Sequence, residues 1–112
     1  MRKEERAILL RIFIGESDKY DGKPTYQYLL QEFKKLKLAG ATVLRGIAGF
    51  GKKSYHIQTT SVLRLSSDLP VIIEVVDTEE KIAQIKPLLD KVVKEGLITE
   101  ERVTIYFYGS NV

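Results

Sequence analysis

The sequence predicts an α+β fold in which two helices cover one face of an antiparallel sheet. Apolar runs typical of strands fall at 7–14, 41–48, 70–76 and 103–108, and segments with helical periodicity lie between them. The order is therefore strand, helix, strand, strand, helix, strand. Because strand–helix–strand crossovers are right-handed, two such units give a ferredoxin-like βαββαβ sandwich with both helices on one side.

Length and composition bound the class of protein. The 112 residues suffice for a single domain, 1–112, and 44% hydrophobic with 29% charged residues is an ordinary soluble composition. The absence of cysteine excludes disulfides, thiolate zinc sites and cysteine nucleophiles. The run 7–14 is interrupted by Arg11 and is too short to span a membrane, so we expect a cytoplasmic protein.

The first strand–helix unit is predicted from residues 7–40. Ile8, Leu10, Ile12 and Ile14 would share one face of the strand, and the opposite face is also largely apolar. Pro24 suits the first helical position and Gly40 a left-handed position just after the helix. Between them lies an apolar stripe with helical spacing, made of Tyr26, Leu29, Leu30, Phe33 and Leu36.

The middle of the chain combines two strands with a polar loop. Strand 41–48 leads into Gly49-Phe50-Gly51, which lets the backbone bend sharply, and then into the loop KKSYHIQTT. Residues 61–65 read as a short strand, and 70–76 as a central strand because VIIEVV is almost continuously apolar.

The second helix and the last strand complete the predicted fold. Asp77 and Glu80 have the spacing of a capping box, Pro87 lies inside the apolar stripe, and Gly96 is expected to end the helix. The last strand is expected at 103–108.

The sheet face away from the helices is expected to be apolar and bare. It would carry Leu9, Phe13, Ile72 and Val76, which is more apolar surface than a monomer usually exposes, so self-association is implied. Arg11 and Glu74 lie on neighbouring strands of that face, and we interpret them as a buried ion pair at a subunit interface.

The chain resembles a known family. The segments GATVLRGIAGFG and DLPVIIEVVDTEEKI and the final strand are similar to the PII-like family of domain of unknown function 190, over nearly the whole chain. Gly-Phe-Gly before the loop and Leu69-Pro70 before the central strand are also similar to the nitrogen-regulatory PII proteins. The resemblance implies a homotrimer with a nucleotide or small-anion site in each cleft between subunits and a loop that contacts a target protein.

The resemblance also implies which residues take part. Ligand contacts fall on Gly49, Phe50, Gly51, Lys52, Lys53, Gly96 and Arg102; the partner-contact loop on Tyr55, His56 and Ile57; the oligomer interface on Leu9, Arg11, Phe13 and Glu74. The segment EGLITEERV departs from the glycine-bearing turn of PII proteins, so only Arg102 keeps its cationic role there. His56, the only histidine, cannot build a metal site by itself.

Three function classes follow. The first is a non-enzymatic regulatory protein of the PII-like kind, with an adenine nucleotide as its possible ligand and no certain cofactor. The second is a sheet-face RNA-binding module, suggested by the net charge of +3 and by Tyr106, Tyr108 and Phe13, although VIIEVV lacks the aromatic residues of such modules. The third, an acylphosphatase-like hydrolase, would need an arginine after the first strand, where GESDKYDGK offers only lysines. The regulatory interpretation is preferred.

Overall fold

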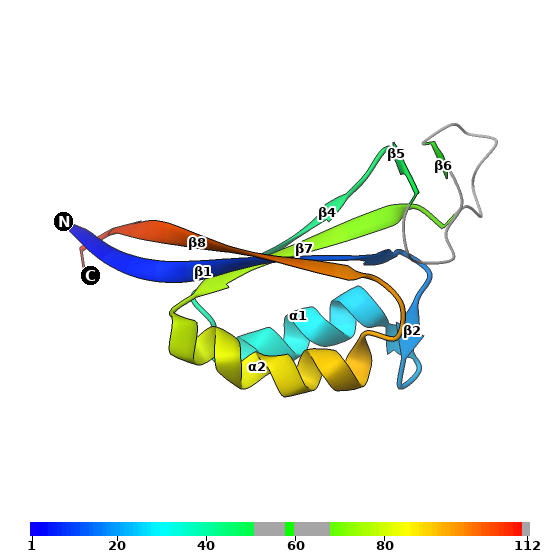
Figure 1. Cartoon of the computed structure of the whole chain (residues 1–112), viewed down its shortest axis with the longest axis horizontal. Coiled ribbons are helices and arrows are strands. Elements are labelled where there is room, and N and C mark those ends of the chain that lie inside the picture. Colours follow the sequence, from blue (N-terminus) through cyan, green and yellow to red (C-terminus); the bar gives the residue numbers. More distant parts are fainter. Residues whose placement is uncertain (51–57, 60–67, 111–112) are drawn as a thin grey trace.

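The computed structural model describes residues 1–50, 58–59 and 68–110. Four antiparallel strands form the main sheet in the order β4 (Gly40–Arg45), β7 (Pro70–Asp77), β1 (Arg2–Gly15) and β8 (Leu97–Tyr108). Helices α1 (Thr25–Lys35) and α2 (Glu79–Val92) lie together on one face of this sheet (Figure 1). Two short pairs complete the structure, β2 (Lys19–Tyr20) with β3 (Lys23–Pro24) and β5 (Ala48–Gly49) with β6 (Gln58–Thr59). The α+β fold with two helices on one face is confirmed.

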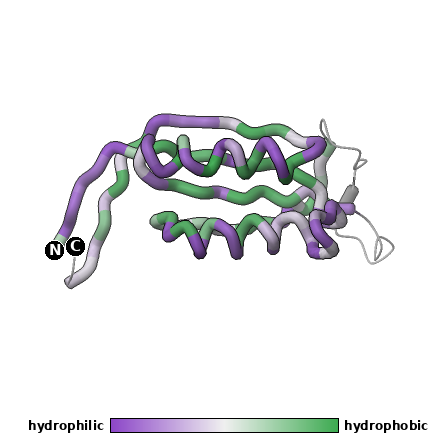
Figure 2. Tube along the Cα trace, turned by 90° about the horizontal axis from the view of Figure 1, so that it is seen from below, coloured by the Kyte–Doolittle hydropathy of each residue, from purple (hydrophilic) through white to green (hydrophobic). Residues whose placement is uncertain are grey.

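The core forms between the helices and alternate residues of the two central strands. Hydrophobic and hydrophilic residues alternate along both helices (Figure 2), so each helix can bury one stripe against the sheet. The buried members are Ile8, Leu10, Ile12 and Ile14 of β1, Val71, Ile73 and Val75 of β7, Leu29 and Phe33 of α1, and Ile82, Ile85, Leu89 and Val92 of α2. The predicted inward faces are confirmed for these residues, whereas Leu30 and Leu36 of the stripe expected in α1 are exposed.

The opposite sheet face is bare within the described part of the chain. Leu9 pairs with Val76, and Phe13 with Ile72, and all four side chains are only partly buried. Because successive strand residues point to opposite faces and Leu10, Ile12, Ile73 and Val75 are buried in the core, these four side chains point away from the helices. We call this surface, made of Leu9, Arg11, Phe13, Ile72, Glu74 and Val76, the bare face.

Helix α1 ends earlier than predicted and without a glycine. Its last residue is Lys35, and Lys37, with φ of 60°, takes the left-handed position that we expected of Gly40. The Lys37 amide donates to the Lys34 carbonyl and the Leu38 amide to the Phe33 carbonyl, which is a Schellman motif. Because partly buried Leu38 packs on the core, the motif holds with a lysine, and Gly40 instead begins β4.

The first residues of both helices also differ from the prediction. Pro24 is the N-cap of α1 rather than its first helical residue. Thr78, not Asp77, caps α2, since the Thr78 hydroxyl accepts from the Lys81 amide at 3.3 Å. Asp77 accepts instead from the Ala39 amide at 2.7 Å, which ties the start of α2 to the connection before β4. Pro87 does lie inside α2, as predicted.

The outer strands are longer than their apolar runs. β1 begins at Arg2 rather than residue 7, and β8 begins at Leu97 rather than residue 103, because the mostly charged segments 2–6 and 99–102 join the ladder between these strands. Helix α2 correspondingly ends at Val92 and not at Gly96. Beyond Ile8, where β7 stops, residues 2–7 and 103–108 pair only with each other. We call this projecting ribbon the arm; it is visible at the left of Figure 1.

Two further expectations concern particular segments. The strand expected at 61–65 lies outside the described residues. Among the helices of the described ranges, none has the length and apolar character needed to cross a bilayer.

Candidate functional site

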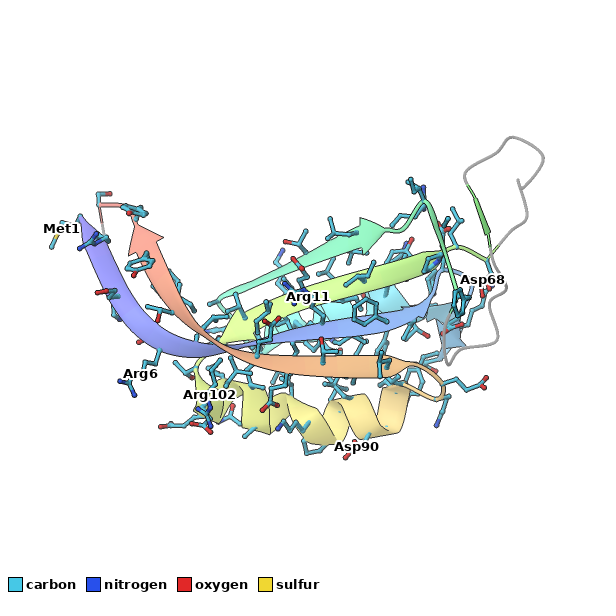
Figure 3. The ribbon with its side chains drawn as sticks, turned by 45° about the horizontal axis from the view of Figure 1, so that its top comes forward. Met1, Arg6, Arg11, Asp68, Asp90 and Arg102 are labelled. Carbon is cyan, nitrogen blue, oxygen red and sulfur yellow. The ribbon has the colours of Figure 1, made fainter. Side chains whose placement is uncertain are left out.

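Four strand ends meet at one end of the sheet. β1 ends at Gly15 opposite Pro70, the first residue of β7, and β4 ends at Arg45 opposite Val71. β8 enters beside them, with Leu97 opposite Phe13. The chain leaves this region after Phe50 and returns at Asp68, which Figure 3 labels at this end. We call residues 15–18, 45–50 and 68–70 the loop end.

Hydrogen bonds fix the chain on both sides of segment 51–67. The Glu16 amide donates to the Leu69 carbonyl at 2.8 Å, and the Gly46 amide to the Pro70 carbonyl at 2.7 Å. The Ser17 amide donates to the Asp68 carboxylate at 2.8 Å. The points from which segment 51–67 departs and to which it returns are therefore held to the rigid sheet, as functional loops usually are.

Glycines at the loop end allow the backbone to approach closely. A Cβ on Gly46 would lie 2.8 Å from Cγ of Pro70, and one on Gly49 would lie 3.2 Å from the same atom. Pro70 therefore packs where larger residues would collide. This packing is a structural reason for the glycine spacing before the loop and for the proline after it, whatever contacts a ligand makes.

Gly15 has a comparable role that the sequence analysis did not assign. A Cβ there would lie 2.6 and 2.8 Å from the two Asp68 carboxylate oxygens. Gly15→Ala should therefore push the Asp68 carboxylate away and weaken its hydrogen bond with the Ser17 amide, at a cost of about 1 kcal/mol. Denaturant unfolding measures the cost, and faster hydrogen exchange at the Ser17 amide reports the lost bond. Wild-type protection of that amide in the variant would contradict this account.

The charge of the described loop end is mainly negative. Glu16, Asp18 and Asp68 supply carboxylates, and Arg45 is paired with Glu16. An anion bound here would therefore need cations from elsewhere, such as Lys52 and Lys53, which lie outside the described residues. Beside the loop end, on the helix side, is a hollow of about 300 Å³ whose lining includes Ser17, Lys19, Thr25 and Lys94.

The structure brings some of the predicted ligand residues together. Gly49 lies in β5 and Phe50 follows it with 77% of its surface exposed, so Phe50 is not a core residue. Gly96 lies at the same end of the sheet, where its Cβ would be 2.6 Å from the Phe13 carbonyl oxygen. Gly51, Lys52, Lys53, Tyr55, His56 and Ile57 lie outside the described residues.

Arg102 does not lie where the sequence suggested. It is not in the connection after the second helix but inside β8, opposite Ile8, where its guanidinium pairs with Glu79 at 3.7 Å. Strand geometry places it roughly 20 Å from Gly96 along β8. In Figure 3 it lies beside α2, far from Asp68. Within one chain, Arg102 and Gly96 therefore do not belong to one site.

Arg11 organises the charges of the bare face. Its Nε donates to Glu74 at 2.9 Å, which confirms the predicted pair, and its second contact is a hydrogen bond to Glu101. These two carboxylates raise the pKa of Arg11 above its ordinary value, so it is charged at every physiological pH. The pair is not buried in one chain, since 37% of the Arg11 side chain and 34% of the Glu74 side chain are exposed. Glu101 was missed because β8 was expected to begin after it.

No metal centre emerges from the described residues. They contain no group of three or more histidine, cysteine or acidic side chains placed to hold an ion.

Comparison with known proteins assigns the family. The model of the family DUF190, described as "Uncharacterized ACR", matches residues 7–105. The chain belongs to this family. A UPF0166 protein of Aquifex aeolicus is 45% identical over 101 residues, covering 88% of this chain and 92% of that protein. A UPF0166 protein of Methanocaldococcus jannaschii is 40% identical over 94 residues, covering 83% and 85%.

A solved structure supports the fold. CPII, a nitrogen regulatory PII-like protein from Thiomonas intermedia K12 bound to ADP, AMP and bicarbonate, superposes with a TM-score of 0.60. The match covers 92% of this chain and 91% of CPII at 14% sequence identity. The chain therefore has the PII-like fold that the resemblance implied, and at this identity the likeness concerns the fold alone.

Proposed function

We propose that this protein is a PII-like regulatory protein that binds an adenine nucleotide or another small anion next to the loop end. The observation that carries the proposal is the meeting of four strand ends at the roots of segment 51–67. CPII, which shares the fold, is described as bound to ADP, AMP and bicarbonate. A ligand at this position would contact the loop directly.

The bare face supports the proposal that the protein is a homotrimer. Leu9, Phe13, Ile72 and Val76 are only partly buried and flank the Arg11–Glu74 pair, and apolar surface of this extent is usually covered by a partner. A second subunit would also bring cations to the loop end, whose described residues are mainly acidic. Static light scattering tests the assembly, and a mass of one 12.8 kDa chain at every concentration would contradict it.

Regulation of this kind requires binding but no chemistry. A ligand that fixes residues 49–60 in one arrangement changes what Tyr55, His56 and Ile57 present to a target protein. Only a ligand with unequal affinity for two loop states can shift their populations. The proposal therefore needs a loop contact rather than a catalytic dyad.

The test is hydrogen exchange with and without ADP, AMP, ATP or bicarbonate. We expect bound ligand to slow exchange at 52–60. Lys52→Ala and Lys53→Ala should each weaken binding about tenfold, because a hydrogen bond to a charged group contributes roughly 1.5–3 kcal/mol. Lys91→Ala, on the exposed last turn of α2, is the matched control.

Arg102→Ala provides a separate test of the inferred ligand residues. Unchanged binding would remove Arg102 from the site and leave the loop lysines as its cations. If none of the four ligands alters exchange at millimolar concentration, nucleotide or bicarbonate binding is contradicted and only the shared fold remains.

The RNA-binding alternative has a weaker structural basis. Tyr106 and Tyr108 point to one face of the arm, opposite Glu4 and Arg2, whereas Phe13 lies on the bare face. The three aromatic rings therefore do not form one stacking surface. The Tyr106 ring is in addition covered by the Arg2 guanidinium, 5.6 Å from its centroid.

A further inference from the structure

The arm is a two-stranded ribbon with one apolar face. Val103, Ile105 and Phe107 alternate along β8 with Thr104, Tyr106 and Tyr108, so the two sets point to opposite sides. The first set is partly buried and the second is exposed. The arm therefore has the pattern of a sheet that is covered on one side.

Nothing in the described part of the chain covers that side. That side faces away from both helices, which lie on the other face of the sheet, and the outer part of the arm projects past them (Figure 1). A two-stranded ribbon is at best marginally stable in water and usually needs a third element on its apolar face. The apolar face of the arm therefore predicts a contact beyond this chain.

The apolar face of the arm continues the bare face. Ala7 opposite Val103 and Leu9 opposite Glu101 are two residues apart on each strand, so these pairs lie on the same side of the ladder. The arm also bends toward that side, away from the helices (Figure 3). Because β1 and β8 run without a turn from the sheet into the arm, the arm cannot fold back over its own sheet.

We propose that the arm lies across the bare face of a second copy of this chain. Each subunit then donates one arm and receives one, which closes a ring of identical contacts. On the docking side the arm presents Lys3 and Glu5 opposite Phe107 and Ile105, whereas Arg2, Glu4 and Arg6 point to the other side. The Arg11 cluster that would receive this side has one cation and two carboxylates, Glu74 and Glu101, so Lys3 is the arm cation that matches its excess negative charge.

This inference deepens the assembly proposed above and rests on it. The family model, which matches 7–105, includes Val103 and Ile105 of the apolar face and ends before Phe107. If the trimer forms through contacts between the bare faces alone, the proposed function still holds, but the arm contact proposed here is wrong.

Ile105→Lys and Thr104→Lys form a matched pair for the test. Lysine at 105 faces Glu5 across the ladder and gains an opposite-charge neighbour, so the arm itself is preserved while its apolar face is broken. Lysine at 104 faces Arg6, which has the same charge, so Thr104→Lys should destabilise the arm itself at least as much as Ile105→Lys does. Sedimentation velocity should show association at least tenfold weaker for Ile105→Lys and unchanged for Thr104→Lys. Wild-type association of both variants would overturn the proposal.

Thiol reactivity gives an independent readout because the chain contains no cysteine. In the assembled protein, Ile105→Cys should react with a maleimide at least tenfold more slowly than Thr104→Cys. Equal rates, or a wild-type protein that stays monomeric, would overturn the arm contact even if Ile105→Lys does not fold. Calorimetry of the wild type with ADP is scored separately, so failure of nucleotide binding is distinguished from failure of the arm contact.

Discussion

Leu29→Ala is expected to lower the free energy of unfolding by about 2–5 kcal/mol. The Leu29 side chain is 0% exposed and packs from α1 into the core cluster with Ile12 and Ile73. Removing it leaves a cavity that the close-packed sheet cannot fill, and a domain of this size has only about 5–15 kcal/mol of stability in total. Urea unfolding at one fixed protein concentration measures the change, since self-association would make stability depend on concentration.

Leu30→Ala is the matched control for this experiment. It removes the same atoms from the next residue of the same helix, but Leu30 is 37% exposed. Its cost should stay below about 1.5 kcal/mol because less apolar surface is lost from the interior. Equal losses for the two variants would mean that α1 does not face the sheet as described.

The core could be predicted from the sequence because the spacing of apolar residues along each helix and strand is a local pattern. The stripe containing Leu29 and Phe33 has helical spacing, and 70–76 is apolar on both faces, so element type followed directly. The Arg11–Glu74 pair could also be predicted, since the fold makes the two strands neighbours and each strand has one charged residue in its apolar run.

The arm and the helix ends could not be predicted in the same way. Residues 2–6 and 99–102 are mostly charged, and their strand conformation comes from pairing with 104–108 and 8–11 respectively, which no local pattern reports. Because β8 was predicted to begin after residue 101, Glu101 was not recognised as the second partner of Arg11. At the end of α1, packing of Leu38 outweighed the preference for glycine, so Lys37 adopts the left-handed conformation.

The candidate site was predicted in part. Gly49-Phe50-Gly51 was expected to let the backbone bend sharply, and the structure instead shows Gly46 and Gly49 packed closely against Pro70, which the sequence did not predict. Assigning Arg102 to the same segment as Gly96 failed because the strand begins directly after Gly96. The roles of residues 51–57 stay predictions.

Gly96→Ala is expected to destabilise the protein by about 1–3 kcal/mol, the usual cost of overpacking. The new Cβ would lie 2.6 Å from the Phe13 carbonyl oxygen and 3.2 Å from Ile14 Cγ2. The carbonyl belongs to the backbone of β1 and cannot turn away without disturbing its pairing with β8, so the entry of β8 at the loop end must shift. Thermal unfolding measures the loss.

Gly40→Ala separates this effect from a general response to replacing glycine. Gly40 is the first residue of β4, as Gly96 immediately precedes β8, yet a Cβ at Gly40 meets nothing within 4 Å, so the variant should keep wild-type stability or gain about 0.4–1 kcal/mol. Calorimetry with ADP then tells whether Gly96 acts by packing against β1 or by contacting the ligand directly. Reduced stability together with weaker binding fits a packing role that positions the loop end, because the shifted β8 would disturb the strands beside Gly15. Wild-type stability with lost binding would contradict the packing account and assign Gly96 to direct ligand contact, as the resemblance to PII proteins implied.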